Sequence, residues 1–372
     1  MLNLIEEFSN PELSQKLLAQ VKNLADQYIQ KHGRKPVFME VCGSHTMALA
    51  RTGIKQVLRD HVKLISGPGC PVCVTDQLFI DSMIELAQDS NRIICTFGDM
   101  IRVPGSNGSL MDAKAEGKDI RVVYSPSDSV KLAEENPDRE VVFLGIGFET
   151  TIPLLAVALK QAQDKNLTNY SMWVTTKLVE PIVRVLLEEK EVEFDGLLLP
   201  GHVSIVLGKD QYSYLTDDYG MPGVICGFYP TEVLIGIYKL IEMLLEDRVG
   251  IENQHPRLVT DSGNRNAQNL MNQFLELCDE GWRGMGMIPK SGMDIREEYA
   301  HLNAKKKFSI QVPEPRKTKC RCGDIIRGVI TPEECPLYAK ACTPLHPIGP
   351  CMVSGEGTCA AHYQYMREEL NG

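Results

Sequence analysis

The hydrophobic pattern of the chain changes at Pro36. Before it, apolar side chains such as Leu13, Leu17 and Val21 recur near helical spacing, which predicts a helix over residues 3–32. After it, short apolar runs of strand type follow one another, each ending in a turn of small residues. The runs read VFMEV, VKLIS, RIICT, RVVYS, EVVFLGI, SMWVTT, GLLLP and GVIC.

Helical segments separate most of these runs, and the clearest span residues 76–88, 151–163, 180–190 and 231–246. Strand, turn and helix in alternation predict an α/β fold with mainly parallel sheets covered by helices on both faces. The eight runs divide into four plus four. We therefore expect two α/β domains of similar build, as a divergent duplication would give, although the halves do not match residue by residue.

The expected organisation has four parts. Residues 1–35 form an N-terminal helix packed on the C-terminal domain, and residues 36–135 and 136–252 form the two α/β domains, joined at EENPDRE. From about residue 253 strand-type runs vanish, and Cys, Pro, Gly and Arg dominate after Lys305. Residues 253–372 are expected to form a small cysteine-rich domain with a thin core, held together partly by a metal centre.

Length and charge narrow the class of protein. A chain of 372 residues is long for a single core. The net charge of −10 argues against nucleic acid or an anionic membrane as the main partner. There is no run of about 20 apolar residues, and the N-terminus lacks the basic and apolar regions of a secretory signal. We expect a cytoplasmic protein.

Twelve cysteines are many for such a protein, and in a reducing compartment they indicate metal binding or thiol redox chemistry. Six of them fall between Cys320 and Cys359, and three sit in Gly- or Pro-rich turns after strands. The other three are interpreted as packing residues: Cys95, Cys226 and Cys278.

The C-terminal cysteines favour a cluster. Cys322, Cys335, Cys342 and Cys359 are separated by 12, 6 and 16 residues, and the other two are Cys320 and Cys351. Four thiolates can hold a [4Fe–4S] cube. A zinc site is the alternative, but zinc modules usually present paired CxxC knuckles, which this tail lacks. Six buried free thiols are the third reading, and spacing alone does not choose four ligands of six.

Chemistry-bearing residues follow the predicted strands, where ligands bind in open α/β sheets. If both sheets present these ends toward each other, one cleft collects thiols, histidines, acids and hydroxyls. The residues are Cys42 in EVCGSHT, Cys70 and Cys73 in GPGCPVCV, Asp99 and Arg102 in TFGDMIRVPG, Glu149 in GIGFETT, and His202 and Ser204 in PGHVS.

The segment Cys70-Pro-Val-Cys73 is a C-x-x-C loop that opens a predicted helix. This spacing permits a reducible disulfide, and a helix N-terminus favours the thiolate of the first cysteine. Inert packing is the alternative. Cys42 alone would more often be a small buried hydrophobe, but its turn contains glycine and is followed by His45.

The remaining candidates each have a structural alternative. His45 and His202 could act directly or be satisfied structural histidines. Asp99 and Glu149 could tune thiol pKa values or transfer protons, or simply cap the helices that follow them. GIGFETT lacks a third glycine and a P-loop lysine, so we do not expect nucleotide binding.

These motifs resemble the HypD family of [NiFe]-hydrogenase maturation factors along nearly the whole chain. The resemblance rests on MEVCGSHT, SGPGCPVCVT, TFGDMIRVPGS, GFETT, LLPGHVS, WRGMGMIPKSG and CTPLHPIGPCMVSGEGTCAA. Two departures are small: CGFYP is less acidic than the family's form, and Met47 stands where some members have a histidine. The second departure removes support for a further histidine role at that position.

The resemblance implies a [4Fe–4S] cluster, ligated through the spacing of 12, 6 and 16 residues. Its ligands would be Cys322, Cys335, Cys342 and Cys359, with Cys320 and Cys351 as bystanders. It also implies a complex with a HypC-type chaperone that holds the Fe(CN)2CO fragment. Cys42 would bind that iron opposite the chaperone's N-terminal cysteine, and a HypE-type protein would supply cyanide. Cys70 and Cys73 match the family's thiol pair, proposed to exchange electrons with the cluster, and with Cys42 they are candidate ligands of the iron fragment.

The sequence therefore leads to a metallocofactor-assembly scaffold with redox activity rather than a conventional turnover enzyme. It would serve the hydrogenase large-subunit precursor through the chaperone. One alternative is a stand-alone iron–sulfur thiol–disulfide oxidoreductase in which Cys42 is merely structural. A second alternative is a zinc-stabilised adaptor.

Overall fold

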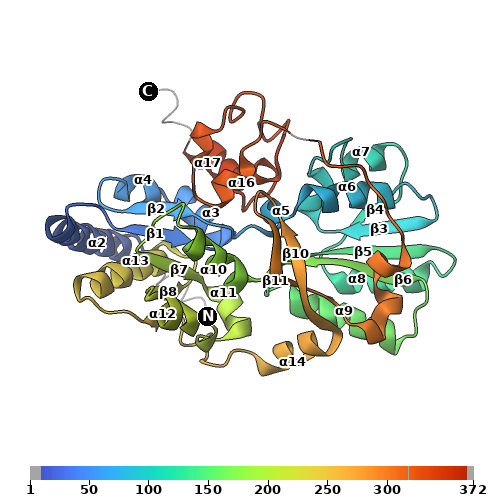
Figure 1. Cartoon of the computed structure of the whole chain (residues 1–372), viewed down its shortest axis with the longest axis horizontal. Helices are drawn as coiled ribbons and strands as arrows, with labels where there is room; N and C mark the ends of the chain where they lie inside the picture. Colours follow the sequence, from blue (N-terminus) through green and yellow to red (C-terminus); the bar gives the residue numbers. More distant parts are fainter. Residues whose placement is uncertain (1–9, 317, 367–372) are drawn as a thin grey trace.

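The computed structural model describes residues 10–316 and 318–366. Two parallel sheets lie side by side along the length of the molecule, and the cysteine-rich tail sits above the junction between them (Figure 1). A long antiparallel hairpin runs down the same junction. The expected α/β class with mainly parallel sheets is confirmed.

The first sheet has five parallel strands in the order β2–β1–β7–β8–β9. The second has four parallel strands in the order β4–β3–β5–β6. If the strands of each sheet are numbered along the chain, both sheets begin 2-1-3-4, so the expected similar build is confirmed. The strands are β1 Val37–Glu40, β2 Lys63–Ser66, β3 Arg92–Thr96, β4 Ile120–Val122, β5 Glu140–Gly147, β6 Tyr170–Thr176, β7 Gly196–Pro200, β8 Gly223–Cys226 and β9 Ile251–Asn253.

The eight expected strands all form, but their division into two consecutive sets of four is wrong. β1 and β2 belong to the same sheet as β7, β8 and β9. All four strands of the second sheet lie between β2 and β7 along the chain. The hydrophobic runs do not reveal this, because a strand buried on both faces reads alike in either sheet. The inner strand β1 pairs with β7 rather than with β3, and the register Phe38–Gly196 to Glu40–Leu198 fixes that pairing.

Alternate residues of the strands face opposite layers of helices. In the first sheet, Phe38 and Leu198 pack toward α13, whereas Met39 and Leu197 belong to the core on the opposite face, where Met39 lies against Gly328 of the tail. The second sheet is covered in the same way by α6 on one face and by α8 and α9 on the other. The principal helices are α6 Gln77–Leu86, α8 Pro126–Glu135, α9 Ile152–Asp164, α10 Val179–Glu189, α12 Ser213–Tyr219, α13 Pro230–Leu245 and α14 Arg265–Phe274.

The N-terminal helix α2 spans Pro11–His32. Asn10 caps its first turn and Gly33 ends it with a positive φ of 70°. Its buried residues Val21, Ala25 and Tyr28 pack with α13, so the expected packing on the C-terminal domain is wrong. The apolar stripe predicted the helix but could not say which surface covers it; residues 1–9 of the expected segment lie outside the described residues.

Strands do not vanish after residue 253, because β10 Leu275–Trp282 and β11 Gly286–Ile295 form an antiparallel hairpin. The hairpin packs on β6 and so lies against the second sheet. The sequence pattern did not predict this hairpin, because a bulge between Cys278 and Glu280 breaks the alternation of apolar and polar residues.

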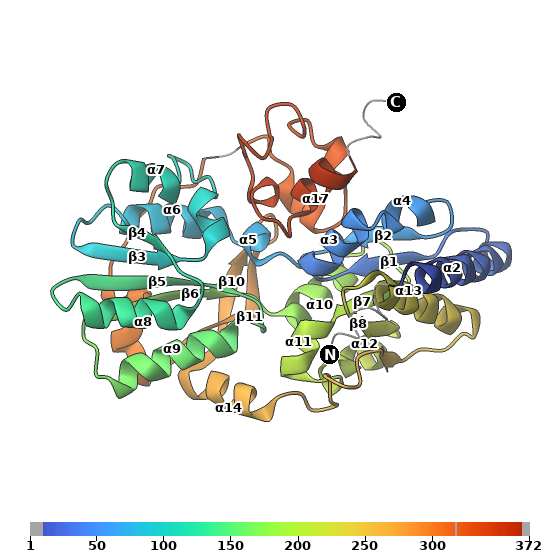
Figure 2. The ribbon, with the colours of Figure 1, turned by 180° about the vertical axis from the view of Figure 1, so that it is seen from behind.

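The tail consists of short elements that cap the junction (Figure 2). They are α16 Cys322–Ile326, η4 Pro332–Glu334, η5 Pro350–Met352 and α17 Thr358–Tyr365. In the described part of the chain, no helix is long and apolar enough to cross a membrane. The other helices are α3 Gly43–Arg51, α4 Ile54–Leu58, α5 Pro71–Val74, η1 Gly98–Arg102, α7 Leu110–Ala115, α11 Gly201–Leu207, η2 Asp210–Tyr212, η3 Glu297–Leu302 and α15 Ala304–Lys307.

Candidate functional site

The strand order of the first sheet reverses between β1 and β7, and the region beyond the carboxyl ends of these two strands, where open α/β sheets bind ligands, is called the crevice below. Cys42 follows β1 and begins α3. His202 follows β7 in the first turn of α11. The chain leaves these two neighbouring strands in opposite directions, so both residues flank the crevice.

Cys42 is almost fully buried, with 8% of its surface exposed. The backbone of Gly69 lies directly against it, because a Cβ on Gly69 would overlap the Cys42 backbone. Burial, and after it the charge of Glu356, raises the pKa of the Cys42 thiol to about 12.

The two predicted histidines share one aromatic neighbour. The rings of His45 and His202 lie 4.6 Å and 3.9 Å from the ring of Phe228. His45 Nε2 lies 3.0 Å from the Gly227 carbonyl and 3.5 Å from the Cys226 sulfur. Burial lowers the pKa of His45 to about 4 and also lowers that of His202. Both imidazoles are therefore neutral at neutral pH.

The C-x-x-C segment opens a helix, as predicted, and Cys70 and Cys73 form a disulfide. Cys70 caps α5, since its sulfur accepts a hydrogen bond from the Cys73 N–H at 3.2 Å. α5 has only four residues, so its dipole adds little to thiolate stability. Cys70 follows Gly69 directly, and the pair therefore lies beside Cys42.

Asp99 does not cap the helix that follows it. Its Oδ2 accepts hydrogen bonds from the Ser354 hydroxyl at 3.1 Å and the Gly355 N–H at 3.4 Å. Arg102 donates to the Val353 carbonyl at 3.3 Å. The tip of β3 thus binds the cysteine-rich tail.

Glu149 follows β5 at the switch point of the second sheet. It is 2% exposed, its Oε1 accepts the Val179 N–H at 2.8 Å, and its Oε2 has no partner. Burial raises its pKa to about 7. Glu149 lines a cavity with Leu178 and Met271 that none of the predicted thiols lines, so the structure does not place it in their cleft.

All six cysteines of the tail line one small cavity: Cys320, Cys322, Cys335, Cys342, Cys351 and Cys359. Five of them are buried and Cys320 is half-buried. The expected bystanders are not set apart, because both line this cavity and the Cys351 sulfur accepts a hydrogen bond from the Cys359 N–H at 3.3 Å. Position alone therefore does not choose four ligands.

The donor set of this cavity fits an iron–sulfur cluster. Within residues 10–316 and 318–366, no group of three or more His, Cys, Asp or Glu side chains is placed to hold a single metal ion. A [4Fe–4S] cube is bound by four cysteine thiolates. A pocket of soft thiols without a histidine or carboxylate suits such a cube.

The tail also touches the crevice of the first sheet. The Ser44 hydroxyl donates to Glu356 Oε1 at 2.7 Å, and Gly43 packs against the same side chain. α5 contacts both α16 and η5, the elements that carry Cys322 and Cys351. Sequence reasoning missed Glu356, Ser354 and Phe228, since no local pattern distinguishes them from loop residues.

The fold and the site identify the kind of protein. It is a doubly wound α/β protein whose candidate functional thiols lie at strand ends and in the C-terminal tail. A sequence model described as "HypD: Hydrogenase formation hypA family" matches residues 12–366. The chain belongs to the HypD family of hydrogenase maturation factors.

Curated relatives cover the chain almost completely. Hydrogenase maturation factor HypD of Cupriavidus necator is 43% identical over 372 residues, covering 98% of this chain and 97% of the relative. HypD of Escherichia coli is 40% identical over 373 residues, with 99% of each chain covered. HypD of Rhodobacter capsulatus is 43% identical over 366 residues, covering 96% and 97%.

Proposed function

We propose that the protein is a scaffold for the Fe(CN)2CO fragment of the [NiFe]-hydrogenase active site. In this proposal Cys42 supplies a thiolate to that iron, which is the cargo, and the tail holds a [4Fe–4S] cluster. The single observation that carries the proposal is the contact of the cysteine-rich tail with the strand ends that bear Cys42 and the Cys70–Cys73 pair.

In this proposal, the residues around Cys42 bind and surround the iron fragment. The crevice residues His45 and His202 are neutral, so they can offer hydrogen bonds beside Cys42 without adding charge. Cyanide and CO make the iron low-spin, which suits soft thiolate ligation. Metal binding requires Cys42 to lose its proton, and its burial keeps the free thiol protonated until the metal arrives.

In the same proposal, the Cys70–Cys73 pair and the cysteine-rich tail carry out the redox chemistry. Cys322, Cys335, Cys342 and Cys359 would hold the cluster, which supplies single electrons when bound. The Cys70–Cys73 disulfide takes up two electrons and two protons to become two thiols. α5 lies on α16 and η5, so no domain movement is needed to bring the pair to the cavity.

The partners follow from the family. We propose that a HypC-type chaperone supplies the second sulfur ligand from its N-terminal cysteine. A HypE-type protein donates cyanide, and the hydrogenase large-subunit precursor receives the fragment through the chaperone. We place this assembly in the cytoplasm.

A stand-alone iron–sulfur thiol–disulfide oxidoreductase is the second candidate. It is favoured by the position of the Cys70–Cys73 disulfide against the tail, which requires no role for Cys42. The two candidates differ in the iron that they bind, because only the scaffold holds iron in excess of the cluster.

Iron and sulfide analysis of anaerobically purified protein tests the proposal. The wild type isolated with its chaperone should contain more iron than sulfide, and Cys42→Ala should contain the two in equal amounts. Equal iron and sulfide in the wild type would favour the oxidoreductase. Zinc with no sulfide would refute both candidates.

A further inference from the structure

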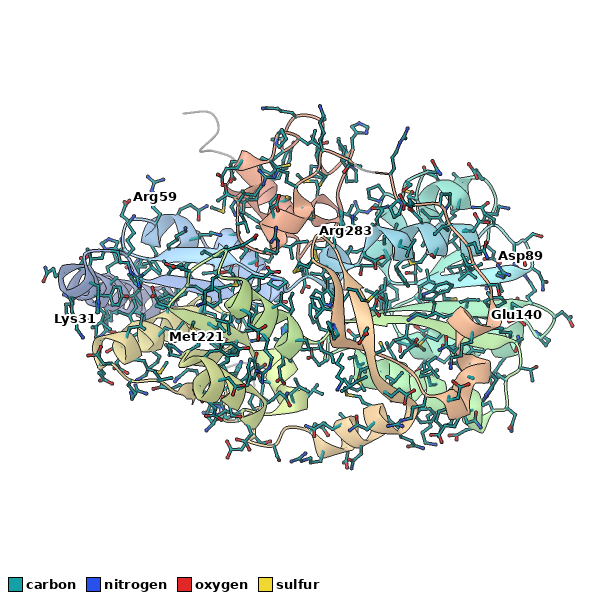
Figure 3. All side chains as sticks on the ribbon, viewed as in Figure 1. Lys31, Arg59, Asp89, Glu140, Met221 and Arg283 are labelled. Atoms are coloured by element: carbon teal, nitrogen blue, oxygen red, sulfur yellow. A yellow bond between two sulfur atoms is a disulfide. The ribbon has the colours of Figure 1, made fainter. Side chains whose placement is uncertain are left out.

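The hairpin turn meets two other segments of the chain at Arg283. In Figure 3 this residue lies at the upper end of the hairpin, below the tail. Its backbone N–H donates to the Val74 carbonyl at 2.8 Å, and Trp282 pairs with Thr75 as an isolated bridge. The turn therefore binds the segment that follows Cys73 directly.

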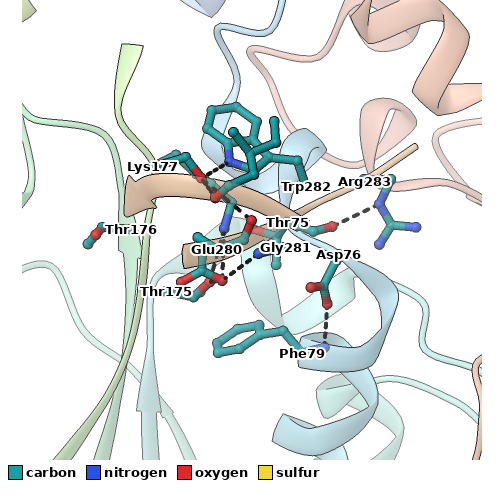
Figure 4. Close-up of polar contacts among 12 residues, drawn as sticks. Thr75, Asp76, Phe79, Thr175, Thr176, Lys177, Glu280, Gly281, Trp282 and Arg283 are labelled. Atoms are coloured by element: carbon teal, nitrogen blue, oxygen red, sulfur yellow. Dashed lines mark hydrogen bonds and ion pairs between the residues drawn. The ribbon is translucent and has the colours of Figure 1, made fainter. Parts of the chain in front are cut away.

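The Arg283 side chain continues along the same segment. Its Nε donates to the Thr75 carbonyl at 2.9 Å, as Figure 4 shows, and its Nη1 donates to Gln77 Oε1 at 3.0 Å. Neither acceptor carries a charge, so these bonds orient the guanidinium without neutralising it.

The third guanidinium nitrogen of Arg283, Nη2, is not used by these hydrogen bonds. Nη2 of Arg283 is buried and has no hydrogen-bond partner, which is costly for a charged donor. Arg283 lines a groove together with Cys320 and Cys322, and the next residue, Gly284, packs against Gly323. The groove that Arg283 lines thus also contains two sulfur atoms of the cysteine cavity, and the carboxylate of Asp76.

We propose that Arg283 is a positioning residue of the redox centre, which orients the segment after Cys73 and offers Nη2 to sulfur in the cysteine cavity. Hydrogen bonds and positive charge near cluster sulfur stabilise the reduced state, because reduction adds one electron and makes the cluster more negative. The inference rests on the proposed function, since it requires the cluster. It assigns a role in redox tuning to a residue outside both groups of cysteines.

A redox titration of the full chain tests this inference, with dithionite as the one-electron reductant and the cluster's paramagnetic resonance signal as the readout. In Arg283→Met, the equilibrium constant for one-electron reduction should fall about tenfold, which corresponds to about 59 mV. Arg283→Lys keeps the charge but loses the planar fork, and should fall between that variant and the wild type.

Arg316→Met is the matched control, because Arg316 lines the same groove but is exposed. Its loss should leave the potential unchanged, since water screens an exposed charge. A purely structural role of Arg283 would lower cluster content without moving the potential of the clusters that remain. If Arg283→Met cannot be isolated with a cluster, Arg283→Lys decides.

A potential equal to that of the wild type in Arg283→Lys or Arg283→Met would overturn the inference while leaving the scaffold proposal intact. A wild type without any cluster would instead refute the proposed function. The two failures are therefore distinguishable in one set of samples.

Discussion

At the scale of single residues, burial sets the protonation states at the strand ends more than any charged partner does. It raises the pKa of Cys42 and Glu149 and lowers the pKa of His45, and it is the largest cause in each case. At neutral pH the side chains of Cys42, His45 and His202 are therefore uncharged, beside the carboxyl group of Glu356. An incoming metal fragment would meet thiol and imidazole groups in their neutral forms.

Glu149 makes stability depend on pH. Burial raises its pKa to about 7, so the folded protein keeps this proton at pH values where the unfolded chain, with the ordinary value of 4.5, has lost it. Its contribution is fully present below the ordinary value and is lost as the pH rises through about 7. Between about pH 4 and pH 8 the wild type should lose about 3 kcal/mol of unfolding free energy relative to Glu149→Gln.

Denaturant unfolding of both proteins at several pH values measures this difference. Glutamine keeps the oxygen that accepts the Val179 N–H and does not ionise. Parallel pH profiles for the two proteins would show that Glu149 does not titrate in this range.

Gly69 positions the crevice through the absence of a side chain. Because a Cβ there would overlap the Cys42 backbone, Gly69→Ala should force the two strand ends apart and cost at least about 1–3 kcal/mol. Gly250→Ala is the control, as nothing lies within 4 Å of a Cβ at that position. Urea unfolding compares them, and equal stabilities would contradict the close approach.

At the scale of elements, the hairpin is fixed to the second sheet by a buried ion pair. Lys177 is fully buried after β6, and its Nζ lies 3.4 Å from Glu280 Oε1 on β10 and 3.1 Å from the Thr175 hydroxyl (Figure 4). Glu280 also accepts the Thr175 hydroxyl at 2.9 Å. The same hairpin carries Arg283, so this pair supports the contact with the segment after Cys73.

Lys177→Met should lower the unfolding free energy by about 3–5 kcal/mol, because it leaves the Glu280 charge buried without its partner. The double variant Lys177→Met with Glu280→Met should recover part of this loss, since it removes both charges. Lys160→Met breaks an exposed pair with Asp164 and should cost less than about 1 kcal/mol. Thermal unfolding compares the stabilities of these three variants. A double variant less stable than Lys177→Met would show that the loss does not come from the unpaired Glu280 charge.

The sequence predicted elements better than their assembly. All eight strand-type runs form strands, because each is a short apolar segment closed by a small-residue turn. Their partition between sheets and the surface that α2 covers depend on contacts between distant residues, which periodicity does not encode. At the site, the strand-end residues were found by the rule that ligands bind beyond strands. Glu356 and Arg283 were missed because their roles arise only from the docking of the tail and the hairpin.

At the scale of the whole molecule, the tail joins the two sheets rather than forming an independent body. It binds the first sheet through Ser44 and Glu356 and the second through Asp99 and Ser354. Its own elements are short, so its order depends on these contacts and on whatever its cavity holds.

Cys335→Ala should remove a cluster ligand, lower iron and sulfide together, and loosen the tail. Limited proteolysis should then cut between residues 318 and 366 while the two sheets stay resistant. Fragment masses locate the cuts, and circular dichroism shows that the secondary structure of the sheets is kept. Cys278→Ala is the control, because Cys278 lies on β10 and outside the cavity. Unchanged iron, sulfide and proteolysis in Cys335→Ala would remove it from the ligand set.

Anaerobic infrared spectroscopy of the protein with its HypC-type chaperone shows whether Cys42 holds the iron fragment. We expect CN and CO stretching bands in the wild type, and their loss in Cys42→Ala while the visible absorbance of the cluster persists. Bands of full intensity in Cys42→Ala would show that another residue holds the iron fragment.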